Sequence, residues 1–176
     1  MSQIYYIDGY NVIHQSPDLE AAFHEDIERA REELIERVTK WVSSTQDVAK
    51  IIFDGQGRRT ETSPHHSDSG PVEILFSSKH KTADQIIERA VFQTNRKDAV
   101  IVVSADRGIT DLCMGMGALV MHPRNFWAQV GEAVAETNRA VEYRRESGAL
   151  GRLEDRFDGD TLQQLDALKE RLKRKR

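Results

Sequence analysis

Short apolar runs that end in an acidic residue recur along the first two thirds of this chain. They are residues 4–7 before Asp8, residues 48–53 before Asp54, and residues 99–105 before Asp106. Runs of this length that are bounded by glycine or polar residues predict buried strands whose ends release polar side chains into a turn. Residues 72–76 and 118–121 predict two further short strands.

Helical periodicity fills the segments between these strands. Apolar residues recur every three to four positions from Ala22 to Val42, with charged residues between them, which predicts a long amphipathic helix. Thr82 with Gln85 three residues later has the pattern of a capping box, so a helix should begin at Ala83. We also expect a short helix closed near Gly115, a helix over 126–145 and a final helix from residue 160 onward.

Strands that alternate with helices predict an α/β fold with a mainly parallel central sheet flanked by helices on both faces. We expect a single domain over residues 1–147. Residues 148–159 would form a hinge, and residues 148–176 as a whole a basic C-terminal helical extension.

The charge is unevenly distributed. The formal net charge is −4, but residues 169–176 contain six basic residues and one acidic residue, a net +5 that leaves −9 for the rest. An acidic body suggests a centre that attracts metal ions, and a basic tail suggests a segment that seeks phosphates. The alternative for the tail is a solvated helix terminus whose basic residues complement the helix dipole.

Several classes of function find no support in the sequence. No apolar run approaches the roughly 18–20 residues that span a membrane, no signal peptide is visible, and the single Cys113 favours a reducing cytoplasmic compartment. The glycine-rich nucleotide-binding motifs are absent, and His65-His66 with one cysteine makes no zinc framework. Tyr10 occupies the second position that an Asp-x-Asp phosphatase would need.

Acidic residues at several strand ends predict a metal site. In a parallel sheet the carboxyl ends point the same way, so Asp8, Asp54 and Asp106 should converge, joined by Asp84 from a helix start. Carboxylates within about 5 Å of one another repel, and Mg²⁺ or Mn²⁺ would relieve that repulsion. Asn11 could orient Asp8. Taken singly, each acid has the alternative role of capping a turn or a helix.

The motifs Asp8-Gly9-Tyr10-Asn11, Phe53-Asp54-Gly55, Ala83-Asp84-Gln85-Ile86-Ile87-Glu88 and Ser104-Ala105-Asp106 together resemble the NYN domain. This domain belongs to the PIN-like nuclease superfamily, and the similarity is to its YacP-like branch over roughly residues 4–145. The resemblance implies a metal-dependent ribonuclease that holds Mg²⁺ or Mn²⁺.

The same resemblance implies roles for individual residues. Asp8, Asp84 and Asp106 match the catalytic metal-binding acids, and Asn11 matches the amide that orients the first of them. Asp111 is a weaker match for a metal ligand. Asp54 and Glu88 are secondary candidates.

We therefore expect a cytoplasmic endoribonuclease that hydrolyses RNA phosphodiester bonds. The family analogy suggests messenger RNA as the substrate and the ribosome as a partner. The residues expected to contact RNA phosphates are Arg58 and Arg59 in the polar loop 56–71, and Lys173, Arg174, Lys175 and Arg176 in the tail. For the loop 56–71, the alternative is a surface loop without a role. For the protein as a whole, the alternatives are a non-catalytic RNA- or ribosome-binding protein and a structure-specific DNA nuclease.

Overall fold

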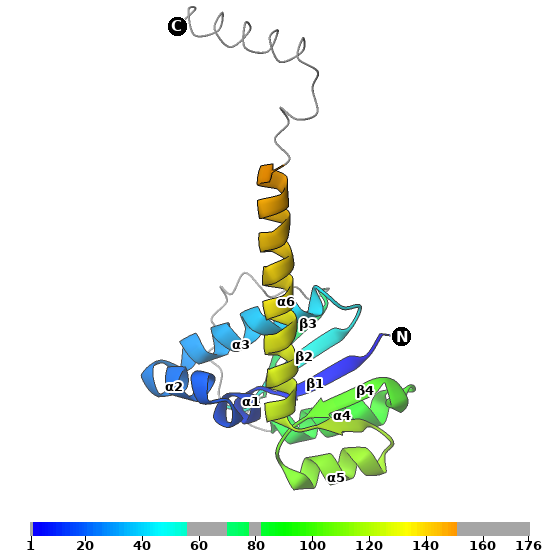
Figure 1. Cartoon of the computed structure of the whole chain (residues 1–176). Helices are drawn as coiled ribbons and strands as arrows, with labels where there is room; N and C mark the ends of the chain where they lie inside the picture. Colours follow the sequence, from blue (N-terminus) through cyan, green and yellow to red (C-terminus); the bar gives the residue numbers. More distant parts are fainter. Residues whose placement is uncertain (1, 56–69, 78–81, 151–176) are drawn as a thin grey trace, which may run out of the picture. The chain divides into compact units, whose positions relative to one another are not determined.

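Five parallel strands form one sheet in the part of the chain that the computed structural model describes, which is residues 2–55, 70–77 and 82–150 (Figure 1). The strands are β1 (Ile4–Asp8), β2 (Val48–Phe53), β3 (Val72–Phe76), β4 (Val100–Val103) and β5 (Leu119–Met121). Their order across the sheet is β3-β2-β1-β4-β5, with β1 in the centre. The register pairs Ile7 with Ile51 on one side and with Val103 on the other. The predicted α/β fold with a parallel sheet is confirmed.

The central strand supplies side chains to both faces of the sheet, because successive residues of a strand point in opposite directions. Tyr5 and Ile7 belong to a buried cluster that also contains Trp41 and Phe126. Tyr6, between them, belongs to a second buried cluster. This second cluster draws on Ile52, Ile87, Val102 and Cys113. The sheet is therefore covered on both faces, as its near-continuous apolar strands require.

The α-helices in the described residues are α1 (Gly9–Gln15), α2 (Pro17–Glu25), α3 (Ile27–Val42), α4 (Ala83–Gln93), α5 (Arg107–Gly115) and α6 (Pro123–Leu150). A short 3-10 helix, η1 (Lys97–Ala99), precedes β4. The capping box predicted at the start of α4 is present, with the backbone N–H groups of Gln85 and Thr82 each donating to the other's side chain. None of the helices in the described ranges has both the length and the hydrophobicity that a membrane span needs.

Two local predictions differ from the structure. The segment after Asp8, expected as a turn, begins α1, because the Asp8 carboxylate accepts a hydrogen bond from the backbone N–H of Asn11 and caps the helix. The single helix expected over residues 22–42 is two helices. Asp26 interrupts it in an extended conformation and caps α3 by accepting from the backbone N–H of Glu28.

The chain divides into two compact units, residues 1–135 and 136–176. Helix α6 begins earlier than predicted, at Pro123, and continues to Leu150, which takes in the first three residues of the hinge expected over residues 148–159. The rest of that segment lies outside the described residues. The final helix predicted from residue 160 lies outside the described residues. The domain boundary at residue 147 and the basic extension stay predictions.

Gly9, the first residue of α1, lies where a side chain would not fit. A Cβ atom placed on it would lie 2.4 Å from Cε1 of the buried Phe53 ring. The start of α1 can therefore pack directly against the end of β2 only because residue 9 is glycine.

We predict that Gly9→Ala lowers the free energy of unfolding by about 1–3 kcal/mol, the usual cost of overpacking a core. Urea denaturation would measure the loss. Gly131→Ala is the matched control, because its added methyl group would meet no atom within 4 Å; it should be neutral or stabilising by up to about 1 kcal/mol through helix propensity. Equal stability of Gly9→Ala and the unmodified protein would contradict the proposed packing.

Cys113 is fully buried in α5, and its thiol should react slowly. Burial, reinforced by the charges of Glu88 and Asp84, raises the pKa of the thiol from 9.0 to about 11. At pH 8 we expect iodoacetamide to alkylate the folded protein at least about 100-fold more slowly than the unfolded protein, because only the thiolate reacts. The thiol has a lower pKa in the unfolded chain, so the unfolded state loses its proton first as the pH rises. The free energy of unfolding should therefore fall as pH rises from 9 towards 11. Equal alkylation rates with and without denaturant would contradict this environment.

Candidate active site

The strand order reverses at the centre of the sheet. From β1 the chain builds outward through β2 to β3, then crosses back so that β4 lies on the opposite side of β1. In open α/β sheets, ligands bind in the crevice at the carboxyl ends of the strands where this reversal occurs. Asp8 is the last residue of β1, and Asp106 follows β4 after two residues. Two of the predicted acids therefore lie at the reversal point.

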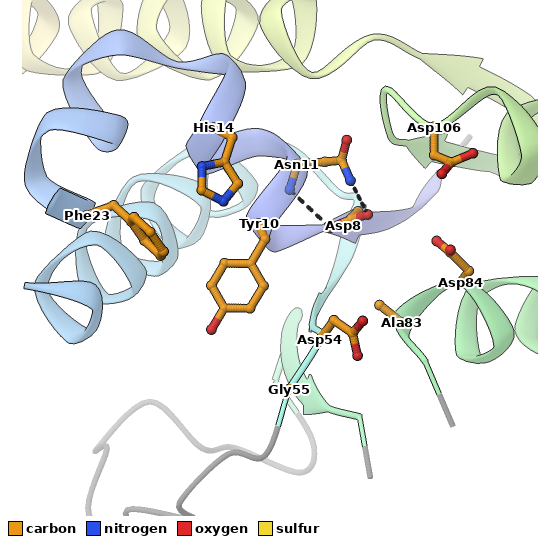
Figure 2. Close-up of a pocket in the computed structure, with 10 residues that line it drawn as sticks. All are labelled: Asp8, Tyr10, Asn11, His14, Phe23, Asp54, Gly55, Ala83, Asp84 and Asp106. Carbon is orange, nitrogen blue, oxygen red and sulfur yellow. Dashed lines mark hydrogen bonds between the residues drawn. The ribbon is translucent and has the colours of Figure 1, made fainter. Parts of the chain in front are cut away.

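Four carboxylates line one open pocket of about 490 Å³ at this edge (Figure 2). They belong to Asp8, Asp54, Asp84 and Asp106, and Asn11 lies among them. The structure thus brings together, from four separate segments of the chain, all of the acids whose positions at strand ends or at a helix start predicted convergence.

The electrostatic environment of these acids favours a positive ion. Asp8 is only 5% exposed, and its pKa is raised mainly by burial, with further contributions from the charges of Asp84 and Asp54. The pKa of Asp84 is also raised, first by burial and then by Asp106 and Asp54. The carboxylates therefore repel one another across the pocket, and a cation would remove that repulsion.

Asn11 ties two strand ends together. Its Nδ2 donates to Oδ2 of Asp8 at 2.5 Å, and its Oδ1 accepts from the backbone N–H of Ala105 at 3.2 Å. With the backbone N–H of Asn11 donating to Asp8 Oδ1 at 3.1 Å, both carboxylate oxygens of Asp8 have a donor. These bonds lower the pKa of Asp8 and oppose the effect of burial. Asn11 thus fixes the orientation of the buried carboxylate and joins it to the loop that carries Asp106.

Three of the four acids also have structural partners. Asp8 caps α1, and Asp106 caps α5 by accepting from the backbone N–H of Gly108 at 2.6 Å. Asp54 accepts from the Ser77 hydroxyl at 2.6 Å. Asp84, in the first turn of α4, has no hydrogen bond or ion pair with another described residue. The capping role and a role in the pocket are compatible, because the two oxygens of a carboxylate together offer about four lone-pair sites.

The remaining predicted site residues are not in this pocket or are not described. Asp111 on α5 and Glu88 on α4 are exposed and do not line it. Arg58, Arg59, Lys173, Arg174, Lys175 and Arg176 lie outside the described residues. Within the described ranges, no three His, Cys, Asp or Glu side chains are arranged so that they could hold a metal ion as they stand.

Sequence reasoning missed the opposite wall of the pocket, which is formed by Tyr10, His14 and Phe23 (Figure 2). Tyr10 and His14 are four residues apart, a spacing that places two side chains on one face of a helix. That signal was hidden because the segment was expected to be a turn.

The fold and the pocket define an α/β protein with an acidic crevice at the point where the order of its parallel strands reverses. Comparison with known proteins gives the family. The model of the YacP-like NYN domain matches residues 5–170, and the chain belongs to this family. Membership implies a nuclease-type function related to RNA.

Individual relatives agree with this assignment. The uncharacterized protein YacP of Bacillus subtilis (strain 168) is 28% identical over 139 residues, which cover 77% of this chain and 79% of that protein. A crystal structure of Rae1 (YacP) from Bacillus subtilis has a TM-score of 0.72 at 23% identity, covering 96% of this chain and 95% of that one. A crystal structure of a mutant of the same protein has a TM-score of 0.65 at 25% identity, covering 94% of this chain and 99% of that one.

We predict that Asn11→Ala destabilises the protein by about 1–3 kcal/mol, because the buried Asp8 loses its side-chain donor and the Ala105 N–H loses its acceptor. Asn11→Asp should be worse still, since it places a second carboxylate beside Asp8. Urea denaturation at neutral pH would measure both. Asn125→Ala, an exposed asparagine of α6, is the control and should stay within about 0.5 kcal/mol of the unmodified protein. An Asn11→Asp variant as stable as Asn11→Ala would contradict the proposed repulsion.

Proposed function

We propose that this protein is a metal-dependent endoribonuclease that hydrolyses RNA phosphodiester bonds at the acidic pocket. The observation that carries the proposal is the gathering of Asp8, Asp84, Asp106 and Asn11 at one pocket, in a chain that belongs to the YacP-like NYN domain family. A cleft that held only carboxylates would repel RNA, so the phosphate backbone requires a cation between it and the protein.

The donor set suits a hard divalent cation. Carboxylate oxygens, with an amide nearby, are ligands that Mg²⁺ or Mn²⁺ prefers. Asp8, Asp84 and Asp106 would hold the ion, and Asp54 would add negative charge to the pocket. Because no three of the described side chains are arranged to hold an ion as they stand, binding requires rotation of side chains. We expect Asp84 and Asp106 to move, since Asp8 is buried and bonded to Asn11.

A divalent cation held by Asp8, Asp84 and Asp106 would supply positive charge beside the scissile phosphate and would favour deprotonation of the attacking water. The protein's own contribution is to fix the Asp8 carboxylate and the backbone that carries Asp106. Asn11 keeps Asp8 in one orientation, and the caps of α1 and α5 fix the backbone that carries Asp8 and Asp106. This preorganisation matters because a displacement of about 1 Å at a catalytic centre can cost 100-fold in rate.

The substrate and the cellular context extend the proposal. By family analogy alone, we extend the proposal to messenger RNA as the substrate, the ribosome as a partner and the cytoplasm as the compartment. A non-catalytic RNA-binding protein is the second candidate, and the lack of a preformed three-residue metal site among the described residues is the observation that favours it.

We predict that Asp8→Asn and Asp84→Asn each lower Mn²⁺-dependent RNA cleavage by at least about 100-fold, because changes outside the direct ligands of a metal already cost about 10–100-fold. Initial rates on a fluorescent RNA oligonucleotide would measure the loss. The matched control is Asp98→Asn, an exposed acid in η1 that should keep full activity. Calorimetric titration with Mn²⁺ should show weaker binding by both site variants.

Two results would count against the proposal. Full activity in a folded Asp8→Asn or Asp84→Asn variant would exclude the site. Absence of both Mn²⁺ binding and RNA cleavage in the unmodified protein would favour the non-catalytic alternative, and faster cleavage of a matched DNA oligonucleotide would favour a DNA nuclease.

A further inference from the structure

The pocket has two chemically different walls. Opposite the carboxylates lie the rings of Tyr10 and His14 from α1 and of Phe23 from α2 (Figure 2). The His14 and Phe23 ring centroids are 4.8 Å apart with an interplanar angle of 72°. The centroid of the Tyr10 ring lies 6.0 Å from that of Phe23 and 6.4 Å from that of His14. We call these three side chains the aromatic wall.

Tyr10, one of the three residues of the aromatic wall, is supported from behind. The Tyr10 ring packs against the buried Phe53 ring with centroids 5.4 Å apart. The guanidinium of Arg31 lies 5.3 Å from the Tyr10 ring and donates to the Tyr10 hydroxyl. Glu28 in turn accepts from Arg31 at 2.6 Å. Tyr10 therefore has a fixed position, which is what a preorganised binding surface needs.

Core packing alone does not explain the wall. Edge-to-face aromatic contacts are common inside proteins, but these rings are not enclosed: Tyr10 and Phe23 are only partly buried, His14 is exposed, and all three face the open pocket. A ligand that satisfies both walls must have a flat, uncharged part for the rings and an anionic part for a cation held by the carboxylates. A nucleotide has both parts, in its base and its phosphate.

We propose that the aromatic wall is a nucleobase subsite, in which the base next to the scissile phosphate stacks on His14 and contacts Tyr10 and Phe23. The subsite deepens the proposed function and rests on it for the placement of the phosphate. Stacking of bases on aromatic side chains accepts every base, because each base has a π-face. The pocket should therefore need a base at this position while discriminating only modestly among the four.

The test measures binding of short RNA oligonucleotides that carry 2-aminopurine at one position, scanned along the strand, because stacking quenches the fluorescence of this base. The matched probe has an abasic nucleotide at the position that is quenched most. Binding is measured in Ca²⁺, and cleavage separately in Mn²⁺. His14→Ala removes the exposed ring, His14→Phe keeps a ring, and Phe92→Ala removes an aromatic side chain, 70% exposed, that does not line the pocket.

The unmodified protein should quench 2-aminopurine at one position and bind that RNA about 10-fold more tightly than the abasic probe, a typical effect of one stacked base. His14→Ala should lose both effects, whereas His14→Phe and Phe92→Ala should keep them. Because His14 is exposed, His14→Ala should unfold in urea at the same concentration as the unmodified protein.

The results separate the subsite from the nuclease. If the unmodified protein cleaves RNA but His14→Ala still binds the base-bearing RNA more tightly than the abasic probe by the same factor, the subsite is overturned and the nuclease stands. If base-dependent binding is lost in His14→Ala although nothing is cleaved, the subsite stands and the proposed activity falls. If the unmodified protein binds base-bearing and abasic RNA equally, the subsite is overturned whatever the activity.

Discussion

The structure depends on a buried carboxylate at the end of its central strand. Asp8 is only 5% exposed, and a carboxylate in such a position is costly unless hydrogen bonds replace the water that it has lost. Asn11 supplies two of these bonds, and its carbonyl oxygen reaches the backbone of Ala105 beyond β4. One side chain therefore satisfies the buried acid and fixes the loop that carries Asp106. The need to keep Asp8 paired determines how the first and fourth strands end.

The junction between β1 and α1 serves packing and the site together. Gly9 lets the helix approach Phe53, and the Phe53 ring supports Tyr10 from behind. Tyr10 then faces the pocket from the helix that begins beside Asp8. A single short segment of about seven residues thus contributes a carboxylate, the amide that orients it and an aromatic surface. The two walls of the pocket cannot be separated from the local fold of this segment.

Acids that repel one another would normally weaken a fold, and burial of Asp8 and Asp84 raises the pKa of both. Part of this cost is offset because Asp8, Asp54 and Asp106 also accept hydrogen bonds that cap helices or hold a loop. The remaining electrostatic repulsion acts between the carboxylates that line the pocket, and a divalent cation bound there would relieve it. Helix capping and the proposed cation site would in this way be complementary uses of the same carboxylates.

Local patterns in the sequence were sufficient for the strands, for the capping box of Thr82 and Gln85, and for placing four acids at strand or helix ends. Each of these depends on neighbouring residues, so periodicity and capping chemistry can predict it. The tertiary structure alone decided the strand order, which brings β4 beside β1 and so places Asp106 near Asp8. It also decided that Glu88 and Asp111, although close to pocket acids in sequence, stay outside the pocket.

The aromatic wall shows the same division. Tyr10, His14 and Phe23 lie within 14 residues of one another, yet their common orientation depends on α1 being a helix and on α2 packing against it. The bond between Asn11 and Ala105 spans 94 residues, and no local pattern specifies it. The sequence determined which groups are available and at which ends of the elements they lie. Packing between distant segments decided which of them share a pocket, because strand order and helix docking are set by long-range burial rather than by local propensity.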